Sequence, residues 1–225
     1  MSTCRVIRLR TLPRPRFGFV SARNETLTAN GSDMKSTLLM RPILMALVVI
    51  LSVGAAFESA RADVVPLPER AGARPQTTAG VPHVQVGVRS FDDVNAEFLR
   101  RVATLPGVEV RPTVVSLPGA KGFWLSERVA FAHPEVIVGG REFAHMHPDG
   151  SLHASLAPGR ARDAVAAGWA TAHPWANQRA GWEGFVMLYT PQSMAELEVT
   201  FQLVVDSYNF VTGRDFLAAD HGGER

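Results

Sequence analysis

The chain is poor in cysteine, because its 225 residues include only Cys4. A single cysteine excludes an intramolecular disulfide, and the rest of the chain has no thiol for nucleophilic catalysis or metal binding. Signatures of several large enzyme classes are also missing. We find no nucleophile elbow, phosphate-binding loop or dinucleotide-binding motif. The sequence therefore gives no support to a hydrolase, a kinase or a dehydrogenase.

The sequence also lacks an apolar run long enough for a typical membrane-spanning helix. The uncharged run at 42–57 has 16 residues, and a spanning helix needs roughly 20. The run follows Arg41 and precedes a small-x-small site that ends at Ala62, which is the layout of a secretory signal peptide. We expect residues 34–62 to be a signal peptide cleaved near Ala62, so that the protein is periplasmic or secreted. The alternative is an uncleaved membrane anchor through residues 42–57.

Positive charge is concentrated in the N-terminal part of the chain. Residues 1–33 form a basic leader with six arginines, and Met34 is a candidate for the true start. Residues 1–62 hold nine of the 23 Lys and Arg and three of the 21 Asp and Glu, which leaves 14 basic and 18 acidic residues for 63–225. This remainder is mildly acidic, so we expect no nucleic-acid partner.

Hydrophobic patterns predict one α+β domain, with a mainly antiparallel sheet, a central histidine-bearing hairpin and a long C-terminal helix packed on it. Residues 63–89 form a Pro/Gly-rich segment, and residues 90–225 form the domain proper. We expect helices at 90–103 (capped by Ser90), 158–167 and 193–213, strands at 84–88, 108–117, 123–125, 136–138 and 185–189, and a loop at 169–184.

The last helix has the clearest pattern. Ser193 and Glu196 are spaced as a capping box, and Gly213 is a natural stop. The helix presents one apolar stripe, which we interpret as core: Leu197, Phe201, Val204, Tyr208 and Val211.

Histidines gather in one short stretch. Three of the seven in the chain are His145, His147 and His153. Residues 143–147 and 151–156 alternate like strands, and the Pro-Asp-Gly between them predicts a three-residue turn with Gly in the left-handed position. In that register His145 lies opposite His153, and all three imidazoles share one face of the hairpin. A two-residue turn would instead put His153 on the other face.

Three convergent imidazoles suit two kinds of site. His145, His147 and His153 could bind a divalent transition metal and leave positions open for substrate or oxygen. They could also act as general bases and hydrogen-bond donors near neutral pH. Gly139 and the following His-x-His fit the first half of the cupin metal motif, but the expected glutamate and the second cupin motif are missing.

A set of ordered motifs carries a family resemblance. They are Arg141-Glu142-x-Ala144-His145-Met146-His147, Ser151-Leu152-His153, Gly168-Trp169-x-x-x-His173-Pro174, Leu188-Tyr189-x-Pro191, the helix from Glu196 to Thr212, and the upstream Leu67-Pro68-x-Arg70-x-Gly72-x-Arg74-Pro75. Together they resemble the luciferase domain of fungal luciferases, which act on 3-hydroxyhispidin, a domain also present in bacterial proteins. The resemblance is good over 141–212 and patchy over 76–140.

The resemblance implies an oxygen-using enzyme that needs no cofactor, with O2 as a co-substrate. A fungal luciferase adds O2 to a hydroxylated styryl-pyranone, and the peroxide-bridged intermediate loses CO2. This chemistry needs a base, donors for an oxyanion and a dry aromatic slot. By resemblance, His145 or His147 is the base, and His153 and His173 orient it or bind the enolate.

The same resemblance implies a set of substrate-binding residues. Arg74 and Arg141 would hold an anionic oxygen of the substrate. Trp169, Trp175 and Tyr189 would form the walls around its ring.

Some positions depart from the fungal pattern. Gln192 stands where the fungal proteins tend to have Arg, and Trp175 and Asn177 replace smaller residues. These departures argue against the same substrate and against light emission. We therefore expect an oxygenase or lyase for an enolisable aromatic or pyranone-type small molecule. The alternatives are a histidine-ligated metalloenzyme and a non-catalytic periplasmic module that binds a small molecule.

Overall fold

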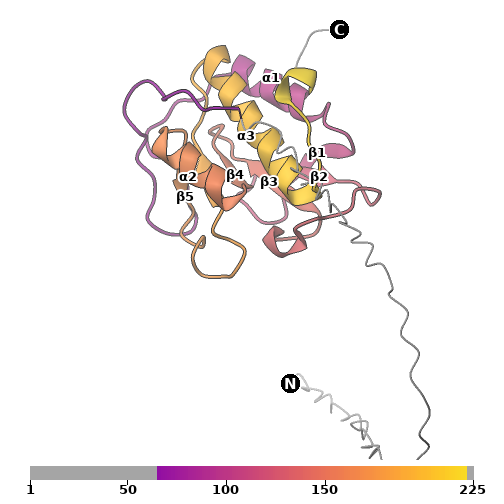
Figure 1. The fold of residues 1–225 in the computed structure, drawn as a ribbon. Coiled ribbons are helices and arrows are strands. Elements are labelled where there is room, and N and C mark those ends of the chain that lie inside the picture. Colours follow the sequence, from indigo (N-terminus) through magenta and orange to yellow (C-terminus); the bar gives the residue numbers. More distant parts are fainter. Residues whose placement is uncertain (1–64, 222–225) are drawn as a thin grey trace, which may run out of the picture. The chain divides into compact units, whose positions relative to one another are not determined.

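The computed structural model describes residues 65–221 of the chain (Figure 1). The expectations for the basic leader at 1–33 and for the signal peptide or anchor at 34–62 lie outside the described residues. Within residues 65–221, no helix has both the length and the apolar character needed to cross a membrane.

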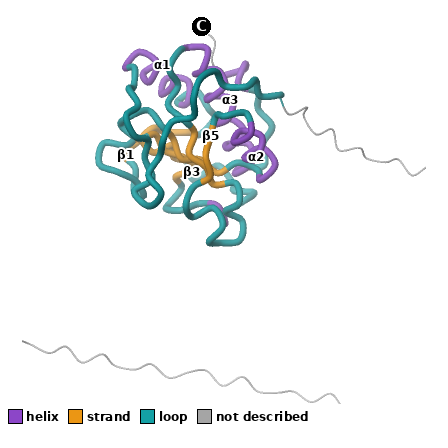
Figure 2. Tube along the Cα trace, turned by 90° about the vertical axis from the view of Figure 1, so that its left-hand side faces the viewer, coloured by secondary structure: helices purple, strands orange, loops and turns teal. Residues whose placement is uncertain are grey.

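A six-stranded antiparallel sheet lies at the centre of the fold (Figure 2). Its strands are β1 (Val108–Pro112), β2 (Lys121–Leu125), β3 (Glu142–Met146), β4 (Leu152–Ser155), β5 (Ala170–Ala172) and β6 (Phe185–Leu188). The strand order is β1-β2-β3-β4-β6-β5, and each neighbouring pair runs antiparallel. The β3–β4 hairpin therefore occupies the middle of the sheet, and the predicted α+β fold is confirmed.

Helices cover one face of this sheet. They are α1 (Asp92–Val102), α2 (Pro158–Ala166) and α3 (Met194–Thr212), with the 3-10 turns η1 (Pro134–Val136) and η2 (Ala218–His221). In Figure 1, α3 runs across β3 and β4, which it contacts, and α1 packs against α3. The helix side is thus the apolar core of the domain.

The long helix forms for the reasons that its sequence indicates. The Ser193 side chain accepts a hydrogen bond from the Glu196 N–H, and Gly213 ends the helix in the left-handed conformation. The Glu196 carboxylate, however, accepts from the Gln192 N–H, so only half of the capping box forms. The predicted stripe is fully buried: Leu197, Phe201, Val204, Tyr208 and Val211.

Several short elements differ from their predictions. Residues 84–88 form no strand, because Gly87 turns to positive φ and only a Thr77–Gln85 bridge remains. The expected strand at 136–138 is wrong as well, since Val136 ends a 3-10 turn.

Three further boundaries also shift. The first helix begins after Phe91 and has no side-chain cap, so Ser90 does not serve as one. The first strand stops at Pro112 instead of continuing to 117. The expected loop at 169–184 contains β5, an edge strand whose three residues pair with β6.

Candidate functional site

The hairpin of β3 and β4 places its histidines as predicted. His145 and His153 are direct partners across the two strands. The His147 N–H donates to the Ser151 carbonyl at 2.8 Å, and Gly150 has a φ of +85° in the turn. The three-residue turn is confirmed, and the three imidazoles line one pocket on one side of the hairpin.

A β-bulge brings Glu142 to these histidines. Strict alternation would put Glu142, three residues before His145, on the opposite face. The β2–β3 register shifts between Phe123 and Trp124, which leaves Phe143 without a partner on β2. The extra residue turns the Glu142 carboxylate, so that its Oε1 lies 3.0 Å from His145 Nδ1.

The Glu142 carboxylate is almost fully buried, and donors surround it. The Thr113 hydroxyl donates to Oε1 at 2.7 Å, and the Val114 N–H donates to Oε2 at 3.0 Å. Gly122 lies opposite His145 on β2, and a Cβ there would stand 2.7 Å from Oε2. Glycine is therefore needed at this position to make room for the carboxylate.

His83 joins the cluster from the Pro/Gly-rich segment, and sequence reasoning missed it. The Thr77–Gln85 bridge closes its loop, and the Gln85 side chain bonds to Thr190 after β6. The Thr78 hydroxyl also accepts from the Val84 N–H inside the loop at 3.0 Å. No periodicity pointed to His83, because its position depends on this long-range contact.

His153 is the centre of a five-histidine cluster. Its ring centroid lies 4.6 to 5.4 Å from those of His83, His145, His147 and His173. All five residues are buried, with 3 to 6% of their surface exposed. Two hydrogen bonds join imidazoles of this cluster directly, His145 to His153 and His153 to His83.

Burial keeps much of the cluster neutral at pH 7. Burial, with smaller contributions from neighbouring imidazoles, lowers the pKa of His147 and of His173 to about 4. Burial also lowers the pKa of His83 and of His153. Neutral imidazoles have one N–H and one lone pair each, so the hydrogen-bond partners decide which nitrogen carries the proton.

One chain of hydrogen bonds fixes three tautomers. Glu142 Oε1 lies 3.0 Å from His145 Nδ1 and favours a proton on that nitrogen, which makes Nε2 of a neutral His145 the acceptor. His153 Nδ1–H donates to that nitrogen at 3.1 Å, and His83 Nδ1–H donates to His153 Nε2 at 3.3 Å. The donors thus point from His83 toward Glu142, and the carboxylate sets the direction of the whole chain.

The other two imidazoles have their own anchors. His147 Nδ1–H donates to Ser151 Oγ at 2.9 Å, and the Ser151 hydroxyl donates to Asp149 at 2.8 Å. His173 Nδ1 accepts the Trp175 N–H at 3.1 Å, so a neutral His173 carries its proton on Nε2. The cluster therefore offers a lone pair on His147 Nε2 and an N–H on His173.

Two groups of three histidines bring ligand nitrogens within 4.8 Å of one another. One group is His145, His147 and His153, and the other is His83, His153 and His173. Neutral imidazoles that already donate through one nitrogen are suited to divalent transition metals. Both groups belong to the described residues and share His153.

The five imidazoles line a cavity of about 270 Å³. This volume is near the lower end of the roughly 300–1,000 Å³ typical of small-molecule pockets. The Trp175 ring packs edge-on against His173, with centroids 5.2 Å apart. The other walls are mainly apolar: Val81, Pro82, Val115, Ser116, Leu117, Val138 and Phe185. The pocket therefore suits a small, partly aromatic molecule.

The predicted site residues separate into two sets. All four predicted histidines and Trp175 line the pocket. The Arg141 guanidinium lies outside it and donates to the carbonyls of Leu125 at 2.9 Å and Ser126 at 3.0 Å. Arg74 donates to the Ala166 carbonyl at 3.0 Å and does not line the pocket either.

The remaining aromatic candidates pack elsewhere. The Trp169 indole N–H donates to the Pro68 carbonyl at 2.6 Å, and the ring is buried. The Arg70 guanidinium lies 5.9 Å from the Trp169 ring centre and 5.8 Å from that of Tyr189. Both aromatics thus help to hold the N-terminal loop to the domain, and neither reaches the pocket.

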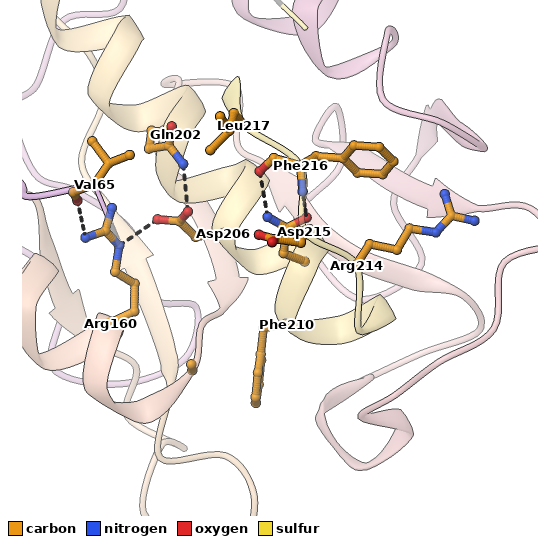
Figure 3. Close-up of a pocket in the computed structure, with 11 residues that line it drawn as sticks. Val65, Arg160, Gln202, Asp206, Phe210, Arg214, Asp215, Phe216 and Leu217 are labelled. Atoms are coloured by element: carbon orange, nitrogen blue, oxygen red, sulfur yellow. Dashed lines mark hydrogen bonds and ion pairs between the residues drawn. The ribbon is translucent and has the colours of Figure 1, made fainter. Parts of the chain in front are cut away.

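A second cavity, of about 260 Å³, lies between α2, α3 and the C-terminal segment (Figure 3). Arg160 donates to Asp206 at 2.6 Å, and Gln202 donates to the other carboxylate oxygen at 2.7 Å. Burial raises the pKa of Asp206, while Arg160 opposes that effect. The polar groups here mainly bind one another, apart from Arg160 Nη2, which has no partner among the described residues.

Comparison with known proteins gives one family match and one relative. The family model of the luciferase domain matches residues 140–207, which run from the start of β3 into α3. This segment of the chain is therefore similar to a luciferase domain. A protein named luciferase from Armillaria ostoyae is 28% identical over 166 residues, which cover 65% of this chain and 61% of the fungal protein. The chain thus spans about three fifths of the length of that relative. No solved structure matches.

Proposed function

We propose that this luciferase-like protein is an oxygenase that adds O2 to an enolisable, ring-hydroxylated small molecule. The observation that carries the proposal is the pocket itself, where five buried imidazoles meet apolar and aromatic walls. A luciferase domain match over residues 140–207 supports the same reaction class. The proposal includes neither light emission nor the pyranone substrate of fungal luciferases.

The proposed reaction begins with loss of a proton from the substrate hydroxyl. His147 lines the pocket, and the lone pair on its Nε2 can accept this proton. His173 Nε2–H can donate to the resulting oxyanion, since its other nitrogen is held by the Trp175 N–H.

The enolate then supplies the electrons for oxygen addition. Its electron-rich carbon forms a bond to O2, and the second oxygen atom carries the negative charge of the resulting peroxide. No external reductant or organic cofactor is required, because the substrate itself is oxidised. The apolar walls formed by Trp175 and Phe185 exclude water from this intermediate.

The test is oxygen consumption by the purified protein with a panel of hydroxylated pyranones, phenols and related enols. We expect uptake with at least one of them, and we expect His147→Gln to lower the rate by about 10²- to 10⁴-fold. His133→Gln is the matched control, because His133 is a half-exposed histidine that pairs with Glu135 outside the pocket.

One outcome would overturn the oxygenase, and a second would overturn only the role of His147. If a panel compound binds tightly and no oxygen is consumed, the protein is a binding module. If oxygen is consumed equally by wild type and His147→Gln, the base is not His147.

A further inference from the structure

We propose that His145, His147 and His153 form a binding site for one divalent transition-metal ion, with Glu142 as the outer partner that prepares it. The ligand atoms are His145 Nε2, His147 Nε2 and His153 Nδ1. This site would lie at the wall of the pocket that we assign to the oxygenase. The inference rests on the proposed function only for what the ion does, since ion binding is measured separately.

The nitrogen positions are close to those that an ion requires. His145 Nε2 and His153 Nδ1 lie 3.1 Å apart. Two nitrogens bound tetrahedrally to one zinc ion at about 2.0–2.1 Å are separated by roughly 3.4 Å. One ring nitrogen of each of the three histidines lies within 4.8 Å of the other two. The hairpin register therefore supplies most of the required geometry.

Outer partners already hold two of the ligands in the correct tautomer. The Glu142 carboxylate lies 3.0 Å from His145 Nδ1 and favours a proton there, and His147 donates Nδ1–H to Ser151 at 2.9 Å. Each imidazole therefore directs its Nε2 lone pair to the cluster. Such carboxylate–histidine and hydroxyl–histidine pairs orient metal ligands in general.

The third ligand needs two histidines, His153 and His83, to move their protons from Nδ1 to Nε2. His153 Nδ1–H donates to His145 Nε2 when no ion is bound. An ion displaces that proton, and His153 then donates from Nε2 to His83 Nδ1, which lies at 3.3 Å. His83 is thus the group that accommodates the change of tautomer.

The second group of three histidines fits less well. His173 Nδ1 accepts the Trp175 N–H at 3.1 Å, so a neutral His173 has its proton on Nε2. That nitrogen has no lone pair to give to an ion. His173 therefore remains a donor to the substrate, and the ion belongs at the hairpin.

The ligand set indicates which ions to test. Three imidazoles without a thiolate or a bound carboxylate suit zinc, cobalt, nickel, copper or iron, and they disfavour magnesium and calcium. Three protein ligands also leave a position open toward the pocket. A substrate hydroxyl bound there would lose its proton to solvent more easily, because a cation lowers its pKa. The ion, and not the His147 lone pair, would then promote the loss of the proton from the substrate hydroxyl.

The experiment uses the full chain without a histidine tag, stripped with a chelator and titrated with Zn²⁺ and with Co²⁺ by calorimetry. Metal content of protein purified without chelator is measured beside it. We expect close to one ion per chain for wild type and for His133→Gln. His147→Gln should lose stoichiometric binding while keeping the wild-type circular dichroism spectrum.

Glu142→Gln tests the outer partner by reversing a tautomer. The Val114 N–H can only donate, so the amide oxygen of the new side chain must face it, and the amide NH2 then faces His145. His145 Nδ1 becomes an acceptor and Nε2 loses its lone pair. We expect a 10- to 100-fold weaker affinity. Glu135→Gln changes the exposed Glu135–His133 pair in the same way and should leave affinity unchanged.

The outcomes separate the two proposals. Absence of stoichiometric binding in wild type, or equal binding by His147→Gln, would overturn the metal site. Equal affinity of Glu142→Gln and wild type would overturn the role of Glu142. Stoichiometric binding without oxygen uptake would reject the oxygenase and keep the site. Oxygen uptake by protein that binds no ion would reject the site and keep the oxygenase.

Discussion

Two glutamate–histidine pairs in this protein have nearly the same contact distance and different surroundings. In the hairpin, Glu142 lies 3.0 Å from His145, and their side chains are 1% and 7% exposed. At η1, Glu135 lies 2.9 Å from His133, and their side chains are 45% and 42% exposed. Water can replace either partner in the second pair and neither in the first. Burial, and not the contact itself, therefore lets Glu142 determine which ring nitrogen carries the proton in the hydrogen-bonded histidines.

The largest expected difference between the two pairs appears when the carboxylate of each is removed. Glu142→Ala leaves the Thr113 hydroxyl, the Val114 N–H and His145 without their acceptor in a buried place, and we expect a loss of about 3–5 kcal/mol in the free energy of unfolding. Glu135→Ala should leave that free energy unchanged within error. Urea denaturation of both variants measures the difference. Equal losses would contradict the importance of burial.

The second-largest expected effect is the loss of stability in acid, which the buried cluster should cause and the exposed pair should not. The pKa of His147 is about 4 in the folded protein and near 6.5 when unfolded, so the unfolded state binds protons first as the pH falls. The stabilisation is complete above pH 6.5 and is lost on the way to about pH 4. For chelator-treated protein we expect His147 alone to cost roughly 2 kcal/mol between pH 7 and pH 5.

His173, His83 and His153 shift in the same direction and add to this loss. Denaturation curves at pH 7, 6 and 5 measure it, and His147→Gln should show a shallower dependence on pH. A profile that is flat from pH 7 to pH 5 would mean that the cluster is not held neutral.

The smallest effect concerns the space around the buried pair. Gly122→Ala puts a Cβ 2.7 Å from Glu142 Oε2, and we expect a loss of about 1 kcal/mol together with a displaced carboxylate. Gly80→Ala is the control, because nothing lies within 4 Å of a Cβ there. Thermal unfolding measures stability, and the NMR shifts of His145 report its tautomer. An unchanged tautomer would show that Glu142 has room to adjust.

The sequence predicted the hairpin and the long helix because both depend on local rules. The Pro-Asp-Gly turn sets the register that pairs His145 with His153, and the apolar spacing that begins at Leu197 sets the buried stripe. The bulge at Phe143 and the position of His83 beside the other histidines could not be predicted from local rules. Each depends on a distant partner, β2 in one case and Thr190 in the other.

The sequence placed the four histidines and Trp175 at one pocket, but the other predicted substrate-binding residues do not line it. Arg141 and Tyr189 fit a binding role by type and by resemblance, yet neither lines the pocket: Arg141 contacts main-chain carbonyls and the Phe131 ring, and Tyr189 contacts Arg70. A residue type shows what a side chain can bind but not which neighbour it meets. The expectations for export and for the leader concern residues 1–62 and stay predictions.

The loop that carries His83 has a consequence for how such proteins can diversify. Val81, Pro82 and His83 line the pocket but lie outside the segment that matches the luciferase domain. The histidine hairpin and the loop that lines the pocket beside it are thus separate stretches of the sequence. If the proposed reaction takes place at the hairpin, a change in the loop can select a different small molecule without changing the histidines, and libraries for new substrates should begin there.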